Sequence, residues 1–238
     1  MIDMHYHILP GVDDGAKDME MSVALARLSA AEGTHTIVCT PHMNAEEDDL
    51  SKLDLHTERM RMVQEKIDEE GLGIRLIQAA EWMLTPDLID VVLEKGRIGE
   101  TKNFLFELNQ YIPLEAAQGF VEIARSEGLF PVLAHPERYR SVTVDTQQAL
   151  LAPIVAQGGL LQVTSGSLIG HFGRSVQKTA EAIVKSFPKN IVIASDAHWP
   201  DTRPPQMKPG YEALEKLDAQ LVLNARANAA RLIDTTLS

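Results

Sequence analysis

The stretch IVIASDAH, residues 191–198, joins an apolar run directly to two side chains that can bind a metal, Asp196 and His198. The β-branched residues in Ile191–Ala194 favour a buried β-strand. The same change, from a short apolar run to His, Asp or Glu, is repeated along the chain. It predicts both the fold and the place where the functional residues meet.

Seven apolar runs alternate with longer amphipathic segments. The runs are Ile2–His5, Thr36–Cys39, Ile74–Ala79, Phe104–Leu108, Pro131–Ala134, Leu160–Val163 and Ile191–Ala194. Helices are expected at Glu20–Glu32, Lys52–Glu70, Leu114–Glu127, Asp145–Gln157 and Gln177–Ser186, with one or two closing helices in Gly210–Ile233. Strands that alternate with helices form βαβ units and a mainly parallel sheet. Seven runs fit a closed or nearly closed α/β barrel better than an open six-stranded sheet. Since no linker or low-complexity tract divides the sequence, we expect a single domain over residues 1–238.

Ionisable side chains follow six of the seven runs. They are His5, His7, Asp14, His42, Glu81, Glu107, His135, Asp196 and His198, whereas the sixth run, in LLQVTSGS (160–167), offers only neutral polar groups. In a barrel of alternating strands and helices, the loops after the strands meet at one rim, so these nine side chains would converge. Imidazoles and carboxylates in such numbers call for cations to neutralise them, and we expect two or three divalent ions. The absence of a thiolate favours Mn, Fe, Zn or Co over a cysteine-rich zinc site, without choosing among the four.

Two arginines, Arg138 and Arg203, stand close in sequence to the proposed ligands. A guanidinium matches the geometry of a phosphate, so both are candidate catalytic residues that bind phosphate, with an ion pair to a nearby acid as the alternative. Clustered divalent ions commonly activate water for phosphoester hydrolysis. A cysteine-dependent tyrosine phosphatase needs an arginine six positions after its cysteine, but Ala45 stands six positions after Cys39. No GxSxG, Walker A or GxGxxG motif is present, so direct attack by metal-activated water remains.

Composition restricts the partners and the compartment. The net charge of −12 argues against a nucleic-acid backbone as the main partner. Cys39 is the single cysteine, so no intramolecular disulfide can form, which fits a reducing compartment. No signal-peptide pattern and no apolar stretch of membrane-spanning length occurs. We therefore expect a cytoplasmic protein without direct membrane insertion.

The segments MIDMHYHILPGVDDGAKD, TPH, AAEWML, FELN, AHPERY and SDAHWPDTRPP, in this order, closely resemble the PHP (polymerase and histidinol phosphatase) superfamily. Within it, the chain is similar to the bacterial capsular and exopolysaccharide tyrosine-protein phosphatases of the CpsB type, from residue 1 to about residue 233. The resemblance implies a distorted TIM-like (β/α)7 PHP barrel with a trinuclear site that commonly uses manganese. It assigns the ions to three sets: His5, His7, Glu81 and Asp196; Glu81, Glu107 and His135; and Asp14, His42 and His198.

The resemblance also implies a function. The family hydrolyses phosphotyrosine, typically in the tail of a cognate bacterial autokinase that controls capsule or exopolysaccharide synthesis, and Arg138 and Arg203 match its phosphate-contacting arginines. The nearest alternative is a small-molecule phosphomonoesterase of the same superfamily, such as a histidinol phosphatase. A nuclease is disfavoured by the charge, and a non-enzymatic regulator, in which metals only hold the barrel together, has no use for the two arginines. Tyr6 and Trp82 depart from the usual family pattern and could narrow the mouth of the site or alter what fits. Family members can self-associate, so a homo-oligomer is possible.

Overall fold

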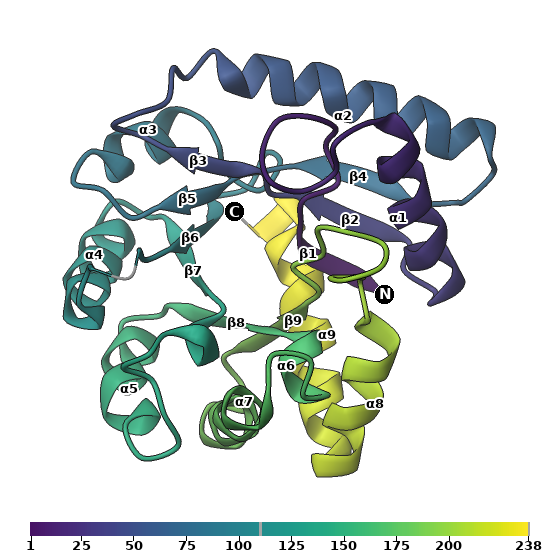
Figure 1. Cartoon of the computed structure of the whole chain (residues 1–238). Helices are drawn as coiled ribbons and strands as arrows, with labels where there is room; N and C mark the ends of the chain where they lie inside the picture. The colour runs from purple at the N-terminus through teal and green to yellow at the C-terminus, as the bar shows by residue number, and fades with distance from the viewer. Residues whose placement is uncertain (110, 238) are drawn as a thin grey trace.

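The protein is described here by a computed structural model that covers residues 1–109 and 111–237. Its strands run parallel around a common axis, and most of the helices surround them (Figure 1). The strands are β1 (Ile2–Tyr6), β2 (Thr36–Cys39), β3 (His42–Asn44), β4 (Arg75–Gln78), β5 (Glu81–Met83), β6 (Asn103–Glu107), β7 (Phe130–Ala134), β8 (Leu160–Thr164) and β9 (Ile191–Ala194). They pair in the orders β1-β2-β4 and β3-β5-β6-β7-β8-β9, in parallel throughout. The expected α/β architecture with parallel strands is confirmed.

Two short strands that the sequence did not predict, β3 and β5, continue two of the predicted strands beyond a break. β2 and β3 are separated at Thr40–Pro41, and β4 and β5 at Ala79–Ala80. Hydrogen bonds carry the pairing across both breaks: Ala79 N–H donates to the carbonyl of Cys39 (2.9 Å), and Glu81 N–H donates to that of Pro41 (3.1 Å). The two sheets therefore follow one another as a single curved surface with seven strand positions.

The barrel is distorted where its first and last strands meet. Within residues 1–109 and 111–237, no ladder joins β1 to β9, and a single parallel bridge links Tyr6 to Ala197. Next to it, Asp196 N–H donates to the carbonyl of His5 (2.9 Å), and His7 N–H donates to that of Ala197 (3.0 Å). These bonds join the loop after β9 to the end of β1, so residues from the two ends of the sequence become neighbours.

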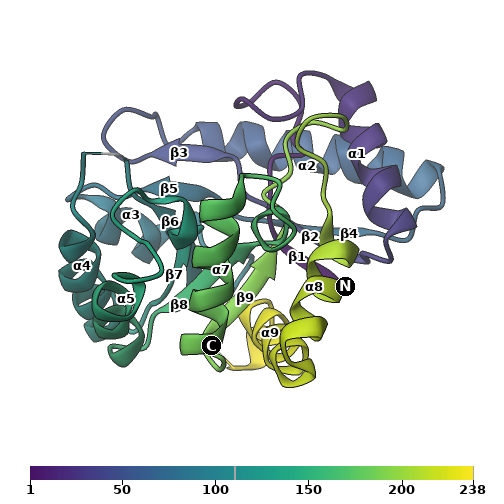
Figure 2. The same ribbon diagram turned by 60° about the horizontal axis from the view of Figure 1, so that its bottom comes forward.

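Most of the helices form the outer layer of the fold (Figures 1 and 2). They are α1 (Met19–Ala31), α2 (Lys52–Glu69), α3 (Leu88–Glu94), α4 (Leu114–Ser126), α5 (Gln147–Ala156), α6 (Ser165–Leu168), α7 (Arg174–Ser186), α8 (Met207–Leu217) and α9 (Ala219–Leu232), with 3-10 turns at Pro136–Arg138 and Thr235–Leu237. The expected closing segment divides into α8 and α9 at Asp218, whose carboxylate caps α9 by accepting from Gln220 N–H (2.8 Å). The short helices α3 and α6 were not predicted.

The inside of the barrel is filled with apolar side chains at its amino-terminal end. Met4, Val38 and Val192 pack there against Ala229 and Leu232 of α9, which lies behind the strands in Figure 1. Each large buried side chain contributes roughly 1.5–3 kcal/mol to folding. Because α9 covers this end, the polar side chains gather at the opposite, carboxyl-terminal end.

Candidate metal centre

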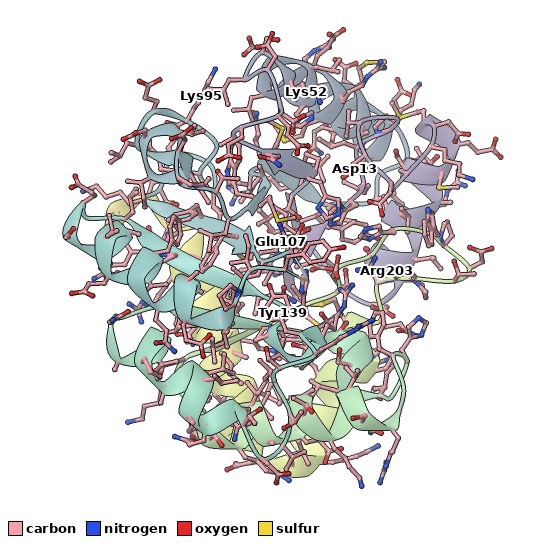
Figure 3. The ribbon with its side chains drawn as sticks, turned by 60° about the vertical axis from the view of Figure 1, so that its left-hand side comes forward. Asp13, Lys52, Lys95, Glu107, Tyr139 and Arg203 are labelled. Atoms are coloured by element: carbon pink, nitrogen blue, oxygen red, sulfur yellow. The ribbon has the colours of Figure 1, made fainter. Side chains whose placement is uncertain are left out.

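The structure brings all nine predicted ligands together at the carboxyl ends of the strands, in the central region of Figure 3 where Glu107, Asp13 and Arg203 are labelled. Donor atoms lie within 4.8 Å of one another in three groups: His5, His7, Glu81 and Asp196; His7, Asp14, His42 and His198; and His42, Glu81 and Glu107. His135 joins through Nε2, which is 2.8 Å from Oε1 of Glu81 and 3.7 Å from Oε2 of Glu107. The first group is the same set that the family resemblance assigns to one ion.

The donor spacing fits shared cations. Nε2 of His5 and Nε2 of His7 are 3.0 Å apart. Oε2 of Glu81 lies 3.0 Å from His5 Nε2, 3.3 Å from His7 Nε2 and 3.1 Å from His42 Nδ1, yet it accepts no hydrogen bond. Metal–ligand bonds of about 2.1 Å place neighbouring ligand atoms roughly 3.0–3.5 Å apart. Oε2 of Glu81, a buried oxygen on which three imidazole nitrogens converge without donating a hydrogen bond to it, suits a divalent cation.

The charges of the site are strongly coupled. Burial by itself raises the pKa of the Glu81 and Asp196 carboxyls. The positive charge of His5 and the nearby hydrogen-bond donors have a larger, opposite effect, so both pKa values lie well below the usual range. For His42, burial lowers the pKa, whereas the carboxylates of Asp14 and Glu107 raise it to about 10. The carboxylates therefore stay ionised at neutral pH and require positive charge around them, from protonated imidazoles or from metal ions.

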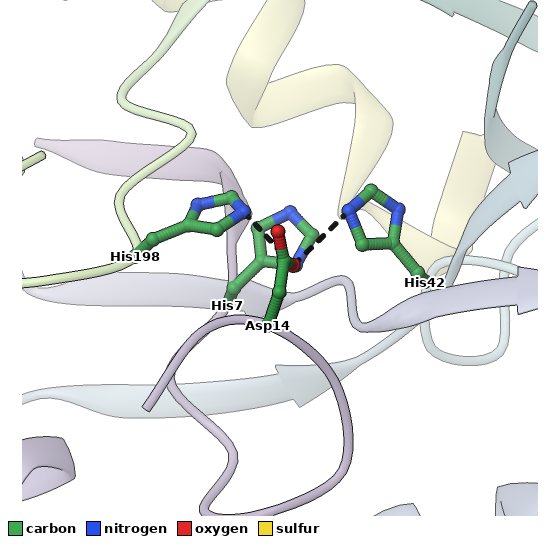
Figure 4. Close-up of side chains that lie close together, drawn as sticks. All are labelled: His7, Asp14, His42 and His198. Atoms are coloured by element: carbon green, nitrogen blue, oxygen red, sulfur yellow. Dashed lines mark ion pairs between the residues drawn. The ribbon is translucent and has the colours of Figure 1, made fainter. Parts of the chain in front are cut away.

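The second group lies on the solvent side of the site. Oδ1 of Asp14 is 3.3 Å from Nε2 of His198 and 3.4 Å from Nε2 of His42, and Figure 4 shows the carboxylate between the two rings. The Asp14 side chain is 60% exposed, whereas that of His198 is 1% exposed. An ion held here would be the most accessible to solvent and to a substrate.

Gly15 brings the loop that carries Asp14 against the end of β1. A Cβ added at this glycine would lie 2.3 Å from the carbonyl oxygen of His7 and 2.5 Å from its Cβ. Ala16 N–H also donates to the His7 carbonyl (3.0 Å). The motif GVDDGA therefore needs a glycine here, because any side chain would push Asp14 away from the imidazoles.

Two supporting residues were missed by the sequence analysis. Gln162 of β8 accepts a hydrogen bond through Oε1 from Nδ1 of His5 (2.9 Å) and another from the backbone N–H of His135 (3.2 Å). Asp13 accepts through Oδ2 from Nδ1 of His7 (2.7 Å). Each contact leaves the Nε2 lone pair of its imidazole facing the cluster. Gln162 could have been found as the polar residue inside an apolar strand, but nothing in the sequence separates Asp13 from its neighbour Asp14.

The two predicted arginines lie at the rim and share one partner. Nη1 of Arg138 and Nη2 of Arg203 both donate to Oδ2 of Asp196. The Phe172 ring, also missed in the sequence, lies beside both guanidinium groups, with its centroid 5.0 Å and 5.8 Å from their central carbons. The side chains of Arg138 and Arg203 are 29% and 17% exposed, so both border the opening of the site.

Backbone strain marks two of the ligands. His135 follows β7 directly and Asp196 lies two residues after the end of β9, with φ of 33° and 53°. Residues other than glycine adopt this left-handed region at a cost of about 1–3 kcal/mol, and such strain is concentrated at functional sites. Both strained residues place their side chains in the cluster, His135 against Glu81 and Asp196 against His5.

The predicted effect of Tyr6 and Trp82 on the mouth of the site is wrong. Both side chains are fully buried. The Tyr6 hydroxyl donates to the carbonyl of Leu25 in α1 (3.2 Å), and Trp82 Nε1–H donates to that of Gly96 (2.8 Å). Because successive strand residues point to opposite faces, the neighbours of His5, His7 and Glu81 face the helices instead.

The comparisons with known proteins agree with this geometry. Residues 1–233 match the family model for capsular polysaccharide synthesis, CpsB/CapC. The chain belongs to the CpsB/CapC family. Its relatives include the tyrosine-protein phosphatase YwqE of Bacillus subtilis, 31% identical over 91% of this chain and 84% of the relative. Another is the putative tyrosine-protein phosphatase CapC of Staphylococcus aureus, 30% identical over 87% of this chain and 81% of the relative.

A solved structure supports the same family assignment. This structure, from a study of YwqE of B. subtilis and CpsB of Streptococcus pneumoniae described as metal-dependent tyrosine phosphatases, superposes with a TM-score of 0.87. It is 29% identical and covers 98% of this chain and 94% of its own. Histidinol phosphate phosphatase of Lactococcus lactis superposes with a TM-score of 0.57 at 13% identity, covering 97% of this chain and 93% of its own, which shows a shared fold alone. Among the described residues of this CpsB/CapC member, no helix has the length and apolar character needed to cross a bilayer.

Proposed function

We propose that this protein is a metal-dependent protein-tyrosine phosphatase that hydrolyses phosphotyrosine by direct attack of water. The observation that carries the proposal is the cluster of nine nitrogen and oxygen ligands with two guanidinium groups at its rim. The naming of YwqE and its relatives as tyrosine-protein phosphatases supports it. Cys39 is fully buried and takes no part in the cluster, which agrees with a cysteine-independent reaction.

The nine residues would hold three ions, most suitably Mn²⁺, with Fe, Zn or Co as the other candidates. The proposed sets are His5, His7, Glu81 and Asp196; Glu81, Glu107 and His135; and Asp14, His42 and His198. When bound, such ions lower the pKa of water and neutralise phosphate charge. Glu81 would bridge two ions, which agrees with its two oxygens facing different imidazoles.

Arg138 and Arg203 would bind the phosphate of the substrate. Their guanidinium groups converge on Asp196 from two elements, so their remaining N–H donors can reach two oxygens of one phosphate. Donors fixed in advance stabilise the charge that develops on those oxygens during in-line displacement. A phenolate, with a pKa of about 10, leaves with little need for a strong acid.

We further propose a single domain over residues 1–238 that acts in the cytoplasm on the phosphorylated tail of a bacterial tyrosine autokinase. The family description, capsular polysaccharide synthesis, supports this kind of partner.

Steady-state kinetics test the proposal and its alternative. Purified protein is assayed with a phosphotyrosine peptide, with the phosphoserine version of the same peptide, and with histidinol phosphate, each with added Mn²⁺. We expect kcat/KM to be highest for the phosphotyrosine peptide. A higher value for histidinol phosphate would overturn the proposal in favour of a small-molecule phosphatase.

A further inference from the structure

A groove of about 460 Å³ opens directly beside the metal centre. It runs between the loop after β6 and the turn after β7, and it begins at His135 and Arg138, which belong to the metal centre. A substrate held by the arginines would therefore extend into this groove.

The walls of the groove next to His135 are apolar. Leu108, Ile112 and Pro113 form one side, and the ring of Tyr139 faces the site from the other. The Tyr139 hydroxyl donates to the carbonyl of Ala134 (3.0 Å) and accepts from Leu108 N–H (3.1 Å), so it ties the two walls together. Its ring centroid is 5.8 Å from that of His135, and Figure 3 shows Tyr139 close to Glu107. A flat aromatic ring suits such a space.

The outer end of the groove is positively charged. Arg140 lines it and is exposed, and it forms no ion pair with any residue in 1–109 or 111–237. By contrast, Arg138 is held by Asp196. In a chain with a net charge of −12, an unpaired guanidinium beside the substrate groove favours a carboxylate from the substrate.

We propose that this groove binds the phenyl ring of phosphotyrosine and that Arg140 pairs with an acidic residue next to the phosphotyrosine in the peptide. The inference rests on the proposed function and adds a sequence preference to it. Phosphotyrosine flanked by Asp or Glu is then the preferred substrate class, and small alkyl phosphates, which lack the ring, are poor substrates.

Matched peptides test the role of Arg140. Three phosphotyrosine peptides carry Glu before the phosphotyrosine, Glu after it, or Gln at both positions. For wild-type protein with Mn²⁺, we expect kcat/KM to be about 3–10 times higher for one of the Glu peptides than for the Gln peptide. The difference should lie in KM, and it should become smaller at high salt. In Arg140→Ala the preference for Glu over Gln should disappear. In Arg75→Ala, an exposed arginine at the other end of the barrel, the preference should remain.

The aromatic wall has its own test. Ile112→Ala should lower kcat/KM for phenyl phosphate about 3–10 times more than for ethyl phosphate, whereas Ile123→Ala, exposed on α4 outside the groove, should leave the ratio unchanged. Equal use of the Glu and Gln peptides by wild-type protein, or a preference that survives in Arg140→Ala, would overturn the inference while the proposed function stands. No hydrolysis of any of the three peptides would instead overturn the proposed function.

Discussion

Nδ1 of His5 donates a hydrogen bond to Oε1 of Gln162 across 2.9 Å, at the bottom of the proposed metal centre. This contact joins the first strand of the barrel to the strand whose end offers no ionisable ligand. It fixes the imidazole with its proton on Nδ1, so the Nε2 lone pair points at Glu81 and Asp196. Gln162 therefore positions a ligand without being one.

Replacement of Gln162 by Leu should weaken the site while the fold persists. Loss of a partner that orients a metal-binding histidine typically costs about 10–100-fold in metal affinity or activity. We expect a loss of this size in Gln162→Leu, measured as kcat/KM and as bound metal after dialysis. Gln148→Leu, an exposed change in α5, is the control. Full metal content and activity in Gln162→Leu would show that His5 needs no such support.

A methyl group at Gly15 should displace the loop that carries Asp14. The added Cβ would overlap the carbonyl of His7, so Gly15→Ala should lose activity at least tenfold, and addition of more Mn²⁺ should restore part of it. Gly119→Ala is the control, because nothing lies within 4 Å of a Cβ there. That change, inside α4, should stabilise the fold by about 0.5–1 kcal/mol, read from thermal unfolding. Unchanged kinetics in Gly15→Ala would contradict the role given to this loop.

Binding of metal should release protons. The carboxylates of Asp14 and Glu107 outweigh the effect of burial and raise the pKa of His42 to about 10, so this imidazole carries a proton at neutral pH when no metal is bound. A ligand must be neutral to bind, so affinity should rise with pH up to that value. Calorimetry of Mn²⁺ binding to chelated protein, in two buffers of different ionisation enthalpy, measures the released protons. Identical heats in both buffers would contradict the charge distribution described here.

Cys39 should be inert in the native protein. It is fully buried, and burial raises the pKa of its thiol, so little thiolate is available. We expect no reaction with a thiol reagent such as 5,5'-dithiobis(2-nitrobenzoate) until the protein is unfolded in guanidinium, and near-normal activity for Cys39→Ala. Rapid native labelling that abolishes activity would instead indicate cysteine chemistry.

The sequence was informative where a strand ended in a charged residue. Parallel strands end at the same rim, so His5, Glu81, Glu107 and Asp196 could be placed together without any knowledge of distances. The family resemblance then separated them into sets, and the first of these has the same members as a cluster in the structure.

Other features depended on details that residue type does not carry. Tyr6 and Trp82 point away from the site, because neighbouring residues of a strand point to opposite faces. The family resemblance, which compares residue types, did not show this orientation. The short strands β3 and β5 lie beyond the apolar runs Thr36–Cys39 and Ile74–Ala79, so apolar character alone did not predict them. The groove beside His135 arises from the packing of two loops, which residue type alone does not show.

The ligand cluster itself is tested by single substitutions. His5→Ala or Glu81→Ala should abolish turnover, because each removes a donor from the most buried group of ligands. Circular dichroism should show the secondary structure retained, and the bound metal should fall. Activity close to that of wild type in either variant would contradict the assignment.

The most direct measurement is hydrolysis of a phosphotyrosine peptide by purified protein, first after removal of metals with a chelator and then after addition of Mn²⁺. We predict that activity is lost on chelation and restored by the metal, with His5→Ala inactive in both states. Full activity in the chelated protein, shown to be free of metal, would contradict a metal-dependent phosphatase.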